Sequence, residues 1–120
     1  MIEEYRFGKM MIEGDEYNYD VEVDWEGEVL EWTRKNSHII DKEDIERALE
    51  KEPEIIVVGT GESGVAQVTE DAKQKCKEAG VELIIDITEE AVKTFNVICA
   101  ESLEEDGEQA EVIGLFHLTC

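Results

Sequence analysis

The chain has 120 residues, of which 32 are acidic and 11 are basic, so its formal net charge is -21 at neutral pH. This length suits one domain, and we expect residues 1–120 to fold around one core without disulfides or a metal. A negative charge of this size repels nucleic acids and anionic membrane surfaces, so we expect neither of them to be a partner.

Cysteine usage and hydropathy indicate where the protein acts. The three cysteines, Cys76, Cys99 and Cys120, are odd in number and widely spaced, which is not typical of a disulfide framework. No apolar run reaches the roughly 18 residues of a membrane span, and the first residues lack the pattern of a signal peptide. We therefore expect a cytoplasmic protein.

The first third of the chain has the period of a β-strand. Residues 17–23 place two tyrosines and two valines on one face and polar residues on the other, which predicts a half-buried strand. Glycine-containing turns lie on both sides of it. Segments 7–12 and 28–32 are therefore expected to pair with it in an antiparallel meander.

Residues 32–38 combine basic side chains with a histidine and a tryptophan. Two interpretations are open. Arg34 and His38 could form a small cationic corner that binds a carboxylate or a phosphate. Alternatively, the segment is a polar turn whose charges pair with nearby glutamates.

Three helices are predicted. Asp41 is a good N-cap for a helix over 42–51, which Pro53 ends. A second helix is predicted over 69–79, with Thr69 as its cap and Gly80 at its end. A third helix is expected to follow Thr88 as its cap, and its apolar face comprises Ala91, Val92, Phe95, Ile98, Cys99 and Leu103.

Asn96 lies on the flank of this third helix. Asparagine is a poor residue for a helix interior, so its presence needs a local reason. That reason is either a hydrogen bond to a neighbouring loop or a contact with a ligand.

Three apolar segments predict the central strands. Residues 55–58 lead into a glycine-rich loop and, with the helix and the strand at 81–86, predict a β-α-β crossover with parallel strands. Residues 112–118 are almost continuously apolar and should lie inside the sheet. The expected class is therefore α/β.

The loop after the first of these strands contains Gly59, Thr60, Gly61 and Gly64. Its spacing matches the Gly-x-Gly-x-x-Gly pattern of dinucleotide sites. However, no helix begins inside the loop, Glu62 would oppose a phosphate, and the remaining chain is too short for the second half of such a fold. We expect no nucleotide cofactor.

Two functions for this loop stay open. It is a tight structural turn, or the backbone of Gly59, Thr60 and Gly61 binds an anion. His117 and Cys120 have half the spacing of a zinc site, but the other half is missing, so we expect no metal. No combination of residues predicts catalysis.

The sequence resembles one small family. The segments that carry the resemblance are 7–10, 32–34 with His38, 53–61, 90–97 with 100–101, and 116–120. The family comprises archaeal and bacterial proteins of unknown function, together with a mitochondrial respiratory complex I assembly factor and an adipogenesis-associated cytosolic protein. The length and the His-Leu-Thr-Cys ending resemble its archaeal branch.

This resemblance implies a three-layer α/β fold with a central mixed sheet, helices packed on it and an extra N-terminal antiparallel β layer. It also implies that the last strand runs antiparallel to its neighbours. The family offers no catalytic residue or cofactor to carry over.

Two functional hypotheses follow. The first is a non-enzymatic interaction or assembly module whose acidic surface and β layer contact a protein partner or a second copy of the chain. The second is a small-molecule or anion binder, or an enzyme, that uses the loop backbone together with Arg34, His38 and Asn96.

Overall fold

The computed structural model describes residues 1–106 and 109–120, with only the backbone for residues 102–106. The apolar position predicted at Leu103 therefore lies outside the described side chains. In chain order the elements are β1 (Ile2–Arg6), β2 (Lys9–Ile12), β3 (Asp15–Tyr17), β4 (Val21–Val23), β5 (Val29–Glu31), β6 (Ile39–Ile40), α1 (Lys42–Glu50), β7 (Ile55–Thr60), β8 (Gln67–Val68), α2 (Glu70–Glu78), β9 (Glu82–Asp86), α3 (Thr88–Asp106) and β10 (Val112–His117).

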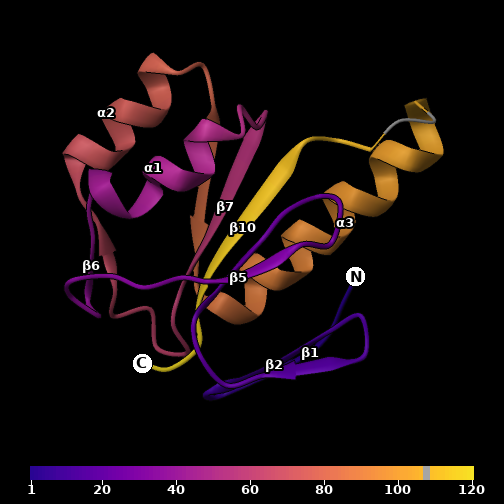
Figure 1. The fold of residues 1–120 in the computed structure, drawn as a ribbon, viewed down its shortest axis with the longest axis horizontal. Helices are drawn as coiled ribbons and strands as arrows, with labels where there is room; N and C mark the ends of the chain where they lie inside the picture. The colour runs from indigo at the N-terminus through magenta and orange to yellow at the C-terminus, as the bar shows by residue number, and fades with distance from the viewer. Residues whose placement is uncertain (107–108) are drawn as a thin grey trace.

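The elements form three layers (Figure 1). The central sheet has the strand order β5-β4-β10-β7-β9, and β1, β2 and β3 form a separate antiparallel sheet. Helices α1 and α2 cover one face of the central sheet, while α3 and the β1–β2 hairpin lie on the other face (Figure 1). The predicted three-layer α/β architecture with its extra N-terminal β layer is confirmed.

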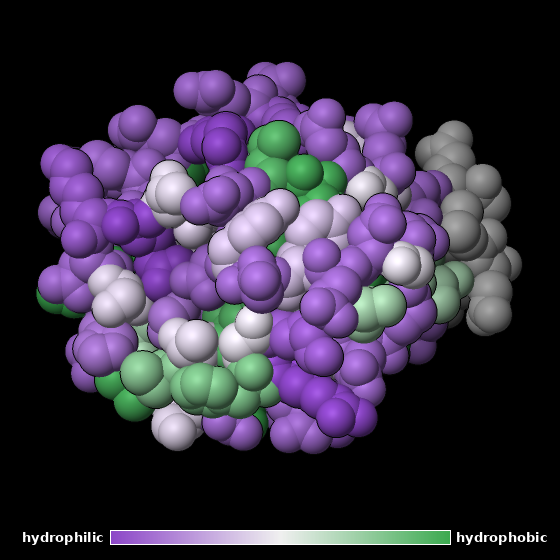
Figure 2. Space-filling view, turned by 60° about the horizontal axis from the view of Figure 1, so that its bottom comes forward, coloured by the Kyte–Doolittle hydropathy of each residue, from purple (hydrophilic) through white to green (hydrophobic). Residues whose placement is uncertain are grey.

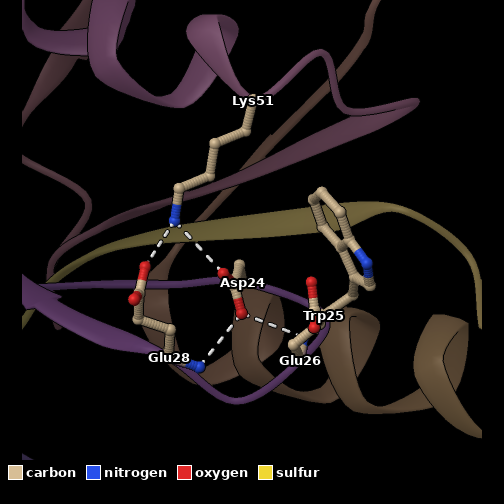
Figure 3. Close-up of a pocket in the computed structure, with 5 residues that line it drawn as sticks. All are labelled: Asp24, Trp25, Glu26, Glu28 and Lys51. Carbon is tan, nitrogen blue, oxygen red and sulfur yellow. Dashed lines mark hydrogen bonds and ion pairs between the residues drawn. The ribbon is translucent and has the colours of Figure 1, made fainter.

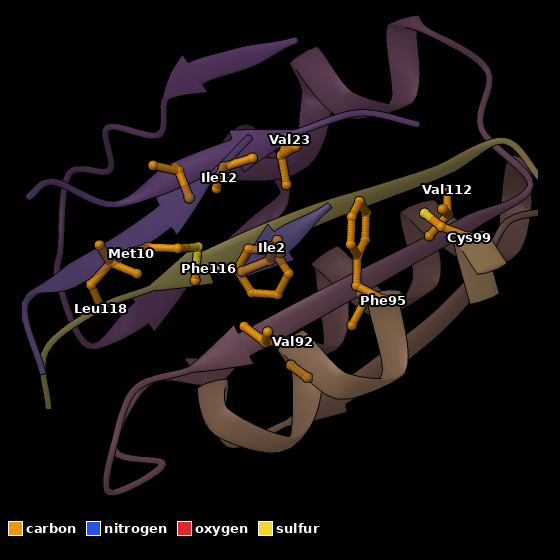
Figure 4. Packing of buried hydrophobic residues seen from close by; sticks show 13 residues of the cluster. Ile2, Met10, Ile12, Val23, Val92, Phe95, Cys99, Val112, Phe116 and Leu118 are labelled. Carbon is orange, nitrogen blue, oxygen red and sulfur yellow. The ribbon is translucent and has the colours of Figure 1, made fainter. Parts of the chain in front are cut away.

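Alternation along the inner strands builds a core on each face. On β10, Phe116 packs toward α3 and Leu115 toward α1 and α2, and on β7 Val57 and Val58 divide in the same way. Both faces of these strands are buried, so their sequences are continuously apolar. Side chains from α3, β10 and the β1–β2 hairpin meet in one cluster (Figure 4).

The predicted helix ends are largely confirmed. Asp41 caps α1 through a capping box with Asp44, and the Thr69 hydroxyl accepts the Ala72 N–H at the start of α2. These caps satisfy backbone N–H groups that have no partner inside the helix.

Two predictions about the strands are wrong. Residues 17–23 do not form one strand, because β3 and β4 belong to different sheets and the chain crosses between layers at 18–20. The last strand, β10, is antiparallel to β4 but parallel to β7. The reason is that α3 returns the chain across the sheet, and such a helical crossover connects parallel strands.

Candidate functional site

The glycine loop lies at the carboxyl end of β7 and is tightly packed. A Cβ atom on Gly59 would lie 2.8 Å from Thr88 Oγ1 and 3.0 Å from Thr88 Cα. Gly61 has a φ of +105°, and a Cβ atom there would lie 2.5 Å from the Cys120 carbonyl. Both glycines are therefore required by the close approach of neighbouring backbone.

The polar groups of the loop are engaged within the chain. Gly61 N–H donates to Thr88 Oγ1 at 2.8 Å, and the Thr88 hydroxyl donates to the His117 carbonyl at 2.6 Å. The Thr60 hydroxyl donates to the Asp86 carbonyl at 3.1 Å. Thr88 thus has a different role from the predicted one, since its side chain links the loop to β10 instead of capping α3.

Residues 119–120 lie against the glycine loop. The Glu62 and Val65 N–H groups donate to the Thr119 and Cys120 carbonyls at 2.7 and 3.2 Å. Cys120 Sγ is in turn 3.5 Å from His38 Nε2. His38 is therefore next to the loop, through Cys120.

Arg34 belongs to a buried network beside this segment. Its side chain is only 3% exposed, and Nη1 lies 2.9 Å from Asp20 Oδ2. This contact is an ion pair between the guanidinium and the Asp20 carboxylate. Arg34 Nη2 donates to the Ser37 carbonyl, and the guanidinium lies over the Trp32 ring at 4.4 Å.

Asp20 and His117 complete the network. Their Oδ2 and Nδ1 atoms are 2.7 Å apart, and the Leu118 N–H donates to Asp20 Oδ1. Burial would raise the pKa of Asp20, but these hydrogen bonds and the nearby Arg34 charge outweigh burial and lower it. Arg34 Nη2 also lies 3.0 Å from His117 Nδ1, so this ring nitrogen is within hydrogen-bond distance of both Asp20 and Arg34.

The sequence predictions did not include Asp20, and they considered His117 only as half of a zinc site. One signal for them exists, because a histidine within an almost continuously apolar strand must find a buried hydrogen-bond partner. The partner lies 97 positions earlier in the chain. Only the antiparallel pairing of β10 with β4 brings the two together.

Asn96 lies apart from this group. Its amide accepts the Ile2 N–H at 3.1 Å and donates to the Ile2 carbonyl at 2.9 Å. The side chain thereby fastens β1 to α3. This contact supplies the local reason for an asparagine within a helix.

A shallow groove of about 400 Å³ opens beside the glycine loop. The groove runs from the glycine loop to the first turn of α2, and Ile85 of β9 also lines it. Six of its lining residues are Thr60, Gly64, Ala66, Val68, Lys73 and Ile85.

The electrostatic field at this end of the molecule is negative. Tyr5 donates its hydroxyl to the Leu118 carbonyl at 3.0 Å. Burial raises the pKa of Tyr5 to about 12, and the charges of Glu62, Asp20 and Glu89 act in the same direction. An anion bound at the glycine loop would meet the same carboxylates.

Apolar side chains are nevertheless exposed there. Val65, Ile85 and Ile87 have exposed fractions of 43%, 39% and 37%, and Ile87 lies close to Gly64. We call these three residues the loop patch. Figure 2 turns this end of the molecule toward the viewer and shows apolar areas within a mostly hydrophilic surface.

A second pocket of about 400 Å³ lies next to the turn between β4 and β5, beside Trp25 (Figure 3). Lys51 Nζ bonds to Asp24 Oδ2 at 3.1 Å and to Glu28 Oε1 at 2.9 Å. Asp24 Oδ1 accepts the backbone N–H groups of Glu26 and Glu28. The chain itself therefore supplies the cation for this acidic pocket.

Helix α1 is held on β4 by two ion pairs. Arg47 and the helix C-cap Lys51, four residues apart, pair with Glu22 on β4 and with Asp24 directly after that strand. Four residues along a helix and two along a strand both span roughly 6–7 Å, so the pairs stay in register.

Replacing Lys51 with methionine is expected to lower the free energy of unfolding by about 1–3 kcal/mol, because the buried Asp24 carboxylate loses its cation. Urea denaturation should measure this loss, with Lys35→Met, at an exposed lysine, as the control. An equal effect of both changes would contradict the role of the pair.

The pH dependence tests the same contact. Burial alone would lower the pKa of Lys51, but the hydrogen bonds to Glu28 and Asp24 outweigh burial and raise it. A raised lysine pKa adds stability that is fully present below its ordinary value of about 10.4 and is lost as the pH rises through the raised value. The wild-type advantage over Lys51→Met should therefore shrink above about pH 10.4.

Among the described residues, no helix is long and apolar enough to cross a membrane. Within the same part of the chain, no group of three or more His, Cys, Asp or Glu residues is arranged to hold a metal ion.

The fold and the packed glycine loop define a small three-layer α/β protein with a mixed central sheet. The chain belongs to a family described as proteins of unknown function (DUF498/DUF598), whose model matches residues 2–107.

Solved structures show the same fold. The conserved hypothetical protein PH1505 from Pyrococcus horikoshii is 28% identical with a TM-score of 0.81, and the match covers 100% of this chain and 99% of that one. A protein named MT938 is 26% identical with a TM-score of 0.76, covering 100% and 98%. A protein from Bartonella henselae, described as an outer membrane protein, is 21% identical with a TM-score of 0.79, covering 99% and 94%. The last likeness concerns the fold alone.

Proposed function

We propose that this protein is a non-enzymatic protein-interaction or assembly module that acts in the cytoplasm. The observation that carries the proposal is the contrast at the glycine loop. The Gly61 N–H and the Thr60 hydroxyl are engaged within the chain, whereas the loop patch beside them is exposed. Clustered apolar side chains on a charged surface are typical of protein contacts.

The charge of the chain supports a basic partner. A net charge of -21 attracts a basic protein over a distance of several ångströms and repels nucleic acids and anionic membranes. The resemblance to a family that includes an assembly factor is consistent with such a role.

Site-specific photo-crosslinking in cells that produce the protein tests this function. A photoreactive amino acid in place of Val65 should give reproducible adducts with the same partner. Placed at Val97, which is 49% exposed on α3, it should give none. The absence of reproducible adducts at Val65 would contradict the proposal.

The second candidate function is binding of a small anion. It is supported by the approach of Arg34 and His38 to the glycine loop through His117 and Cys120, and by the groove next to Thr60. Asn96 lies apart from them, bonded to β1.

Amide chemical shifts of the isotope-labelled protein separate the two functions. Phosphate, citrate, NAD and ATP would be added in turn. Saturable shifts at Gly59, Thr60 and Gly61 would favour the anion-binding function. Unchanged spectra would leave the interaction module as the better account.

A further inference from the structure

The strand β9 ends the central sheet on one side. Within residues 1–106 and 109–120, no strand pairs with its outer edge. At two other edge strands, side chains bond to the backbone. At β5, Arg47 Nη2 donates to the Glu31 carbonyl, and at β1, Asn96 binds both backbone groups of Ile2.

The backbone groups on the outer edge can be identified from the ladder with β7. The Glu82 N–H donates to the Glu54 carbonyl, toward β7. Because successive residues of a strand present their N–H and C=O groups to alternate sides, Ile84 and Asp86 also face β7. Leu83 and Ile85 therefore direct their backbone groups to the open edge.

The side chains of β9 divide between the two faces of the sheet. Glu82, Ile84 and Asp86 share one face, and Leu83 and Ile85 share the other. Ile85 is 39% exposed and lines the groove beside the glycine loop. The strand has no lysine and no proline, two residues that protect natural edge strands from pairing.

Charge indicates which chain can pair here. The strand begins with Glu82 and ends with Asp86. A second copy paired antiparallel about Ile84 would place Glu82 opposite Asp86 twice, and like charges directly opposite are destabilising. Two chains of charge -21 each also repel as wholes. The complementary partner is basic.

We infer that the outer edge of β9 binds an extended segment of a basic partner protein as an added strand. The inference rests on the proposed interaction function and adds the surface and the chemistry of the partner. Basic residues of the segment lie opposite Glu82 and Asp86, and apolar residues between them pack beside Leu83 and Ile85. The matching pattern is basic, apolar, any residue, apolar, basic.

A peptide of known sequence tests this binding. The probe is a capped nine-residue peptide centred on Lys-Val-Thr-Val-Lys, titrated into the full isotope-labelled chain. We expect saturable amide shifts at Leu83, Ile85 and Ile87, and slower hydrogen exchange at the Leu83 and Ile85 amides. The same peptide with glutamates in place of its lysines should not bind.

Variants of the chain locate the site. Ile85→Lys and Glu82→Lys place a positive charge on the edge, and each should weaken binding of the lysine peptide by about tenfold or more. Val97→Lys adds the same charge at an exposed apolar position on α3 and should leave binding unchanged. Glu82 is exposed, so its variant remains informative if Ile85→Lys destabilises the fold.

Three outcomes would overturn the inference. The first is that both edge variants bind the lysine peptide as tightly as the wild type does, and the second is that the peptide shifts amides only on another face. The third is that amide shifts at β9 depend on protein concentration without peptide, which would show that a second copy occupies the edge. If the peptide fails to bind while Val65 still gives reproducible crosslinks, the inference fails and the proposed function stands. If both fail, the proposed function fails as well.

Discussion

Replacing Asp20 with asparagine is expected to lower the free energy of unfolding by about 3–5 kcal/mol, as when one partner of a buried ion pair is removed. The Arg34 side chain is 3% exposed and has Asp20 as its ion-pair partner. An asparagine amide has one acceptor oxygen, so its NH2 group would face either the Leu118 N–H or the Arg34 and His117 side chains. The variant therefore buries a cation without its counter-charge.

Urea denaturation at neutral pH measures this effect. Asp15→Asn removes one negative charge from the exposed start of β3 and should change stability by less than about 0.5 kcal/mol. A similarly small change for Asp20→Asn would mean that the Arg34 charge reaches water, contrary to the burial in the structure.

The pH dependence gives an independent check. The pKa of Asp20 is lower in the folded protein than its ordinary value. A lowered carboxyl pKa adds stability that is present above the ordinary value of about 3.9 and is lost as the pH falls through the folded value. The difference between wild type and Asp20→Asn should thus be full at pH 6 and should shrink below about pH 4.

Replacing Gly61 with alanine is expected to destabilise the protein by about 3 kcal/mol or more, through backbone strain and overlap together. The φ of +105° disfavours any side chain, and the new Cβ would overlap the Cys120 backbone. Relief requires residues 119–120 to move, which breaks their hydrogen bonds to the Glu62 and Val65 N–H groups.

Gly14→Ala is the matched control for this change. Gly14 has a φ of +84°, but no atom lies within 4 Å of the position of its Cβ. It should cost about 1 kcal/mol from strain alone. Equal unfolding midpoints for the two variants would refute the packing of Gly61 against Cys120. Hydrogen exchange at Glu62 and Val65 should accelerate only in Gly61→Ala.

Local sequence patterns determined the helices and the inner strands. Asp41 with Asp44, and Thr69, specify where α1 and α2 begin, because capping depends on residues within one turn. The apolar runs of β7 and β10 predict strands buried on both faces, because the side-chain period lies in the sequence itself. The extra N-terminal β layer came instead from the resemblance to a family.

The tertiary structure decided the strand directions and the candidate site. The parallel pairing of β10 with β7 depends on the path of α3 over the sheet, which no local pattern encodes. Asp20, Arg34 and His117 are far apart in the chain and meet only through the β4–β10 pairing. The glycine spacing in residues 59–64 matched a phosphate-binding pattern, yet Thr88 and Cys120 show that close packing requires Gly59 and Gly61. The sequence by itself determined the helices, the inner strands and the net charge, because these depend on composition and on residues near in the chain. The contacts that define the site join distant residues, so only the folded chain reveals them.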